Sequence, residues 1–247
     1  MSQKYPGGFI TKSPPLPSGP YLNSVATGVW TIDQAMQFKK QGLWPTAGNV
    51  APPPPIGSAY GGGYFAGQIS TAGTGVADFN LVVGPLSSAQ SSLQWKTSDT
   101  STSGTASAIN GPANSAAMND ASHPAAQFCE GLTIAGYSDW YMPARLELDV
   151  CYFGLKPTTT SNNTGAGVNA FSVPTRTSPY TTGTPAQTSA TIFQSGGSEA
   201  FASSGTYWTS TENSASYAWY TFFSNGYQYR RGKTGSRNVR AIRRIAV

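Results

Sequence analysis

The residues with the greatest catalytic potential are one histidine and two cysteines. His123 is followed by Pro124, and the cysteines are Cys129 and Cys151. A serine or cysteine nucleophile activated by a histidine would have to use His123, because the chain has no other histidine. No segment around it has the pattern of a nucleophile elbow. We therefore expect His123 to begin a helix, and we expect no catalytic residue and no enzymatic activity.

The same residues lack the spacing of a metal site. A zinc site takes about three or four His, Cys or carboxylate ligands, and the three residues do not form such a set. Glycoside hydrolysis needs two positioned carboxylates, whereas the ten acidic residues are scattered along the chain. The sequence therefore predicts no metal and no cofactor. Because no secretion signal is visible, we expect both thiols to be reduced, with a disulfide as the alternative.

Aromatic and basic residues crowd into residues 217–233. Successive side chains of a strand face opposite ways, so about half of these aromatic residues should enter a core. The other half should face solvent or a partner. Tyrosine and arginine at this density are typical of binding hot spots. The alternative is that they form an interface between subunits.

The composition favours a folded protein with a neutral surface. Only 10% of the residues are charged, against about 25% in an ordinary soluble domain. Aromatic residues make up 12%, which is enough apolar material for a core. Surfaces rich in Ser, Thr, Asn, Gly and Tyr suit assembly and adhesive contact.

The net charge of +5 is concentrated at one end of the chain. Seven of the fifteen basic residues lie within residues 230–247, where they alternate with apolar residues such as Val239 and Ile242. This alternation favours a strand with one solvated face over a disordered basic tail. We expect no nucleic-acid partner.

Residues 1–55 read as an arm that precedes the main domain. The arm contains Pro14–Pro17, an expected short helix at 31–41, and a proline spacer at 52–55. No apolar run is long enough to cross a membrane, and residues 1–20 have no apolar signal region. We expect synthesis in a cytoplasm, no membrane insertion, and a head at 56–247.

The head has the pattern of a mixed α+β domain. Between its helices and its last strands, residues 157–206 form a long loop region with few periodic signals, and such loops are often functional. Asn225–Gly226 is a strong hairpin turn signal. The expected strands are 61–69, 79–83, 93–96, 206–211, 218–223, 227–231 and 238–245. The expected helices are 114–132, kinked or restarted at Pro124, and 144–153, with Pro143 in its first turn and Gly154 at its end.

Several segments of the head resemble the Lcl C-terminal-like domain family. Gly136–Pro143 is similar to the family's GxxDWRLP-like segment, Glu147-Leu148 to its helical Glu-Leu pair, and Tyr207–Glu212 to its YWSSTE-like segment. The Ala218-Trp219 pair and the closing residues 238–244 also match. The resemblance covers about residues 56–247 and excludes the arm.

The resemblance implies a C-type-lectin-like fold, in which two helices pack on small antiparallel sheets with long loops. It implies structural roles for the motif residues, with Asp139 tied to a turn or an arginine and Glu212 paired with Arg240 or Arg243. The motif residues are Asp139, Trp140, Pro143, Glu147, Trp208, Glu212, Trp219, Arg240 and Arg243.

Two departures from the family pattern concern the start of the second helix. Tyr141 stands where the family has arginine, and Ala144 stands where it has serine or threonine. The loss of a side-chain N-cap should cost about 1 kcal/mol. The calcium-binding triplets of sugar-binding C-type lectins are missing, so calcium-dependent sugar binding is not expected.

The resemblance also suggests the ligand-facing surface. In C-type-lectin-like receptor-binding proteins of phages, the region after Ala218 faces the ligand. The expected ligand- or partner-binding residues are Tyr217, Tyr220, Tyr227, Tyr229, Arg230 and Arg231.

These observations favour a bacteriophage virion protein, because Gly28–Thr31 and Gln41–Pro45 look like the leader of phage structural proteins. The first hypothesis is a tail-fibre or spike component that binds a host surface glycan or protein. Its arm would contact other virion proteins and further copies of the chain, in a homotrimer. The alternatives are an architectural capsid decoration or head fibre, and a bacterial surface adhesin, which the missing signal peptide disfavours.

Overall fold

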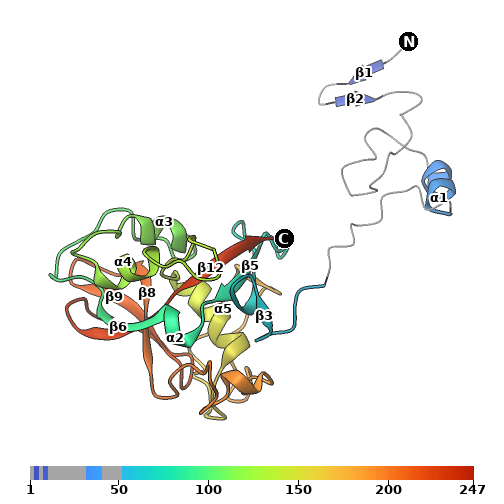
Figure 1. Ribbon diagram of the computed structural model, residues 1–247. Coiled ribbons are helices and arrows are strands. Elements are labelled where there is room, and N and C mark those ends of the chain that lie inside the picture. Colours follow the sequence, from blue (N-terminus) through green and yellow to red (C-terminus); the bar gives the residue numbers. More distant parts are fainter. Residues whose placement is uncertain (1–2, 6–7, 11–31, 41–51) are drawn as a thin grey trace. The chain divides into compact units, whose positions relative to one another are not determined.

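The computed structural model describes residues 3–5, 8–10, 32–40 and 52–247. The chain divides into two units, Met1–Pro53 and Pro54–Val247 (Figure 1). In the first unit, strands β1 (Gln3–Tyr5) and β2 (Gly8–Ile10) pair antiparallel, and α1 (Ile32–Lys40) is the helix expected at 31–41. The proline run at 14–17 lies outside the described residues.

The second unit, the head, is a mixed α+β domain built on two sheets. The first sheet has the strand order β10-β9-β8-β11-β6, and its neighbours are antiparallel except for the parallel pair β8 and β11. Its strands are β6 (Gln90–Gln94), β8 (Thr206–Glu212), β9 (Tyr217–Phe222), β10 (Gln228–Gly232) and β11 (Ser236–Arg240).

The second sheet has the order β12-β5-β4-β3, and the short strand β7 also pairs with β4. All of its pairs are antiparallel. Its strands are β3 (Ala59–Tyr60), β4 (Gly63–Ile69), β5 (Phe79–Val83), β7 (Ser172–Val173) and β12 (Ile242–Ala246).

The helices of the head are short. Figure 1 shows α5 in the middle of the head and α3 and α4 together at one side of it. No described helix is long and apolar enough to cross a membrane. The helices are α2 (Leu86–Ala89), α3 (Gly111–Ala116), α4 (Pro124–Glu130), α5 (Arg145–Leu155) and the 3₁₀ turn η1 (Thr191–Phe193).

The expected helix at 114–132 is two helices, α3 and α4. His123 is the N-cap residue of α4 and Pro124 is its first residue, which confirms that the helix restarts at this proline. Proline suits this position because it has no N–H to leave unpaired.

The second expected helix, α5, differs from its prediction at both ends. Pro143 lies one residue before the N-cap residue Ala144, and the helix continues through Gly154 to Leu155. A Cβ atom on Gly154 would lie 2.5 Å from the carbonyl oxygen of Ala66 in β4. Gly154 therefore permits close approach of α5 to β4 and does not end the helix.

The missing N-cap side chain of α5 is replaced by a distant residue. Thr211 of β8 accepts a hydrogen bond from the backbone N–H of Arg145 at 3.0 Å through its hydroxyl. The carbonyl oxygen of Ala108 accepts from the N–H of Leu146 at 2.8 Å. Because both early amides are paired, the expected loss of about 1 kcal/mol is offset by tertiary contacts.

The last expected strand, 238–245, is two strands in two different sheets. β11 ends at Arg240 in the first sheet, and β12 begins at Ile242 in the second. Between them Ala241 donates its N–H to Ala89 and accepts from Gly84. The expectation of one solvated face is wrong, because Arg240 and Arg243 are buried.

Alternating side chains build two apolar clusters on opposite faces of the strands. Leu81 and Val83 of β5 lie in the cluster around α5, whereas Val82 lies in the cluster beside α4. Tyr207 and Trp208 of β8 divide in the same way. This is the period of two expected for strands covered on both faces.

Candidate binding sites

The first candidate site is the hairpin of β9 and β10. Tyr217, Tyr227 and Tyr229 are 46%, 37% and 42% exposed, and Arg230 and Arg231 are exposed beside them. We call these five residues the hairpin surface. The expected turn is present, because β9 and β10 pair antiparallel and Gly226 has a φ of +74°.

One of the residues assigned to this surface from the sequence lies elsewhere. Tyr220 is 4% exposed and belongs to the cluster beside α4. The Arg237 guanidinium lies 4.3 Å from its ring centre. The expectation that Tyr220 faces a ligand is therefore wrong, and its role is to support the exposed tyrosines.

The aromatic rings of the hairpin form an ordered row. Phe222 and Tyr227 stack with ring centres 6.0 Å apart, and Tyr227 and Tyr229 stack at 5.7 Å. Tyr229 meets the buried ring of Tyr220 edge to face at 6.4 Å. Because each ring contacts a neighbour, the row loses little side-chain entropy on binding a partner.

The arginines stand on both faces of the hairpin. Tyr229 pairs in register with Tyr220, and Arg231 with Ala218, so these side chains share a face. Arg230 pairs with Trp219 on the opposite face. Tyr217, Tyr229, Arg230 and Arg231 line a shallow pocket of about 420 Å³ at this edge of the sheet.

Several motif residues contact other parts of the head. Asp139 accepts two hydrogen bonds from Arg243, at 2.7 and 2.9 Å. Trp140 and Trp208 are buried and donate to the carbonyl oxygens of Tyr137 and Leu93. The Arg145 guanidinium lies 4.6 Å from the ring centre of Trp219.

The other buried carboxylates pair differently from the prediction. Glu212 pairs with Lys233, and Arg240 donates to Glu199 at 2.8 Å. The pairing of Glu212 with Arg240 or Arg243 is therefore wrong. Burial lowers the pKa of Arg240 to about 10, although Glu199 opposes the shift.

Glu147 of α5 contacts Tyr141, the residue that stands where the family has arginine. It accepts hydrogen bonds from the hydroxyl of Tyr141, from the N–H of Ala144 at 2.7 Å and from Arg244 at 2.8 Å. Burial raises its pKa, and Arg244 opposes that shift.

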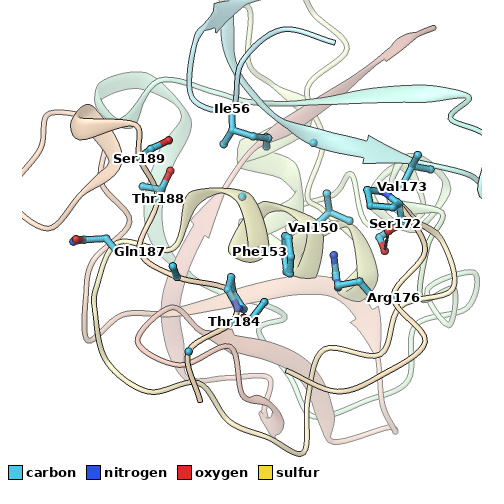
Figure 2. A pocket seen from close by; sticks show the side chains of 17 residues that line it. Ile56, Val150, Phe153, Ser172, Val173, Arg176, Thr184, Gln187, Thr188 and Ser189 are labelled. Atoms are coloured by element: carbon cyan, nitrogen blue, oxygen red, sulfur yellow. Dashed lines mark hydrogen bonds between the residues drawn. The ribbon is translucent and has the colours of Figure 1, made fainter. Parts of the chain in front are cut away.

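The second candidate site is a pocket of about 560 Å³ between α5, β4 and the loop region (Figure 2). Val150 and Phe153 of α5 form one side, Ile56 and Val173 lie across from them, and residues 183–189 close the remaining side. The volume lies within the usual range for small-molecule sites, about 300–1,000 Å³. The sequence does not predict this pocket. It indicates only that the long loop region, residues 157–206, which supplies part of the wall, is of a kind that is often functional.

The one charged residue in the wall of this pocket is neutralised. The guanidinium of Arg176 lies 4.5 Å from the ring centre of Phe153 and donates from Nε to Gly167 at 3.0 Å. It also pairs with the buried carboxylate of Asp149, which accepts a hydrogen bond from Tyr180. The pocket therefore presents no free charge.

The loop wall of the pocket is fixed by two buried polar side chains. Lys156, at the end of α5, donates to the carbonyl oxygens of Thr160 and Pro185. Asn162 also donates to Pro185, at 2.8 Å, and to Thr181 and Thr182. Because these donors satisfy loop carbonyls, the wall is formed before any ligand binds.

His123 and the cysteines take part in the core. His123 is buried between Asp120 and Thr102, with nitrogen–oxygen distances of 2.9 and 2.8 Å. Cys129 and Cys151 are free and fully buried in different apolar clusters. Among the described residues, no group of three or more His, Cys, Asp or Glu could hold a metal ion.

The family model of the Lcl C-terminal domain matches residues 86–243, which is more than half of the chain. The chain belongs to the Lcl C-terminal domain family. No curated protein matches it. The matched region of this Lcl C-terminal domain contains the whole hairpin surface and the loop wall of the pocket, whereas Ile56, Ala66 and Gly67 of the pocket precede it.

Proposed function

We propose that this chain is a structural protein of a bacteriophage virion, in a tail fibre or spike, and that its head binds the host surface. The head is residues 56–247, with a C-type-lectin-like fold. Residues 1–55 attach it to other virion proteins and to further copies of the chain, in a homotrimer. The protein is assembled into particles in the host cytoplasm.

The observation that carries this proposal is the hairpin surface. Three tyrosines and two arginines lie exposed on one hairpin, and the rings of Tyr227 and Tyr229 stack. Exposed groups of tyrosine and arginine are the side chains that binding hot spots prefer. A row with this composition favours a glycan or protein surface as its ligand.

Two further features support a binding role over catalysis. His123 is held by Asp120 and Thr102 inside the core, where it cannot meet a substrate. The carboxylates of Glu147, Asp149 and Glu212 have cationic partners. These ion-paired carboxylates stabilise the fold. Such roles favour a head that binds a ligand over one that catalyses a reaction.

Location on the particle is tested first. Purified particles from cells that carry the gene would be labelled with gold-conjugated antibody against the full chain. We expect label at the tail tip. Label at the capsid would replace the fibre role with a decoration role, and unlabelled particles would reject a virion protein altogether.

The binding surface is tested by adsorption. Particles carrying Tyr229→Ala with Arg231→Ala should assemble normally, because both side chains are exposed, and should lose at least about tenfold in adsorption rate, which corresponds to 1.4 kcal/mol. Particles carrying Val76→Ala with Val168→Ala, two residues that are 72% and 54% exposed elsewhere, are the control. Equal adsorption of all three particles would show that the hairpin surface is not the binding site.

A further inference from the structure

The pocket beside Phe153 has features that the hairpin surface does not explain. Its walls are mainly apolar, and Phe153 is 37% exposed within it. Polar side chains gather on one side, where Thr184, Gln187 and Ser189 line the edge (Figure 2). An apolar pocket with a few convergent polar groups is the usual form of a small-molecule site.

The polar edge has hydrogen-bonding capacity to spare. Thr184 and Ser189 are exposed, and Thr184 makes its hydrogen bond to Thr181 through its backbone N–H, which leaves the hydroxyl groups of both residues open to a ligand. Gln187 uses its amide N–H on the carbonyl oxygen of Pro157 at 2.7 Å, which leaves its side-chain oxygen to accept. Donors and acceptors are both available, so the edge suits hydroxyl or amide groups of a ligand.

The electrostatics of the pocket exclude charged ligands. Arg176 is the only charged residue in the wall, and its guanidinium is already bound by Asp149 and Gly167. An anion would have to compete with the carboxylate of Asp149 for this guanidinium. A cation would meet no free carboxylate.

We propose that this pocket binds one neutral saccharide unit with an apolar substituent, such as an N-acetylated or 6-deoxy sugar. The apolar substituent lies against Phe153 and Val150, and the hydroxyl or amide groups face Thr184, Gln187 and Ser189. The fixed loop wall means that little ordering accompanies binding. The choice of a saccharide over another neutral amphipathic ligand rests on the proposed function.

The test measures binding by the purified full chain to defined probes, using saturation-transfer NMR followed by calorimetry. The probes are the methyl glycosides of N-acetylglucosamine, rhamnose and fucose, together with glucuronic acid, a proline-rich peptide and hexanol. We expect at least one of the three neutral glycosides to bind with a Kd on the order of 1 mM or below, which is about −4 kcal/mol. Glucuronic acid should not bind.

Two variants locate the site. Ser189→Trp places a large ring at the edge of the pocket and should abolish binding, and Phe153→Ala should raise the Kd at least about tenfold. Ser203→Trp, at an exposed serine outside the pocket, should bind as the original chain does. Circular dichroism on all three variants identifies any that fail to fold. If Phe153→Ala fails to fold, Ser189→Trp alone tests the site.

The proposal is overturned if none of the three glycosides binds, if only the peptide or hexanol binds, or if Ser189→Trp binds sugar as well as the original chain. These binding measurements use the purified chain and do not require virus particles. A chain that binds sugar in the pocket but is absent from particles would overturn the proposed function alone.

Discussion

At the residue scale, burial decides the chemistry of the two cysteines. Cys129 and Cys151 have no exposed surface, and burial raises the pKa of both thiols. We expect neither thiol to react with a disulfide reagent such as DTNB in the native protein at pH 8, and both to react at once in denaturant. Fast native labelling of one thiol would show that its cluster opens readily.

Asp149 gives a prediction about pH. Burial raises its pKa above the usual value, and Arg176 opposes the shift. A carboxyl whose folded-state pKa is raised contributes stability below its unfolded pKa, about 3.9. That stability is lost as the pH rises through the folded-state pKa.

Asp149→Asn should therefore be about as stable as the original chain near pH 3.5 and become relatively more stable as the pH rises. The gain is about 1.4 kcal/mol for each unit by which the folded-state pKa exceeds the unfolded one. Urea unfolding between pH 3.5 and 8 measures it. A variant that becomes relatively less stable with rising pH would mean that Arg176 outweighs burial.

The partners of buried charged residues are difficult to predict from the sequence. The motif made Asp139 an expected arginine partner, and Arg243 fulfils that role. The partner of Arg240 is Glu199, which lies in the loop region without any periodic pattern. Tyr220 and Tyr229 pair in register and share a face of the sheet. Their burial differs because β9 lies between β8 and β10, whereas β10 is at the edge of the sheet, and the sequence does not give this strand order.

At the element scale, α5 depends on a residue from another strand. The hydroxyl of Thr211 accepts from the N–H of Arg145 and donates to the carbonyl oxygen of Ser107 at 2.8 Å. Thr211→Val keeps the shape of the side chain and removes both bonds. We expect a loss of about 1–2 kcal/mol in the free energy of unfolding, measured by urea denaturation.

The matched control is Thr97→Val. Thr97 is exposed, and substitutions at such positions usually change stability by less than about 0.5 kcal/mol. If Thr211→Val were equally neutral, water would be replacing the hydroxyl at the helix start, and the tertiary cap would have no energetic role.

Elements with a local signal are predictable from sequence, and those set by tertiary contacts are not. The turn at Asn225–Gly226 and the restart at Pro124 follow from backbone restrictions of single residues, and the structure contains both. The end of α5 and the break at Ala241 depend on Ala66, Gly84 and Ala89, which are distant in sequence. The pocket beside Phe153 escapes prediction for the same reason, because its walls come from five separate segments.

At the scale of the whole molecule, the last residues join the two sheets. β11 lies between β8 and β6 in the first sheet, and β12 pairs with β5 in the second. Deletion of residues 242–247 removes β12 together with the arginine partners of Asp139 and Glu147. We expect the truncated chain to lack the near-ultraviolet circular dichroism of the native head.

A short peptide tag added after Val247 is the control for that deletion. Val247 is 47% exposed, so the extended chain should keep its near-ultraviolet signal and its melting temperature. A truncated chain with a native-like spectrum would show that β5 forms its sheet without β12.

The position of β11 and β12 in two different sheets has a consequence for biosynthesis. A ribosome makes β11 roughly 140 residues after β6, yet β11 is the only strand neighbour of β6 in the described part of the chain. Pairs so distant in sequence form slowly. The first sheet therefore cannot be completed until β11 has been synthesised, and until then Trp95 and Trp208 lack the contacts that Val239 and Ala241 give their cluster.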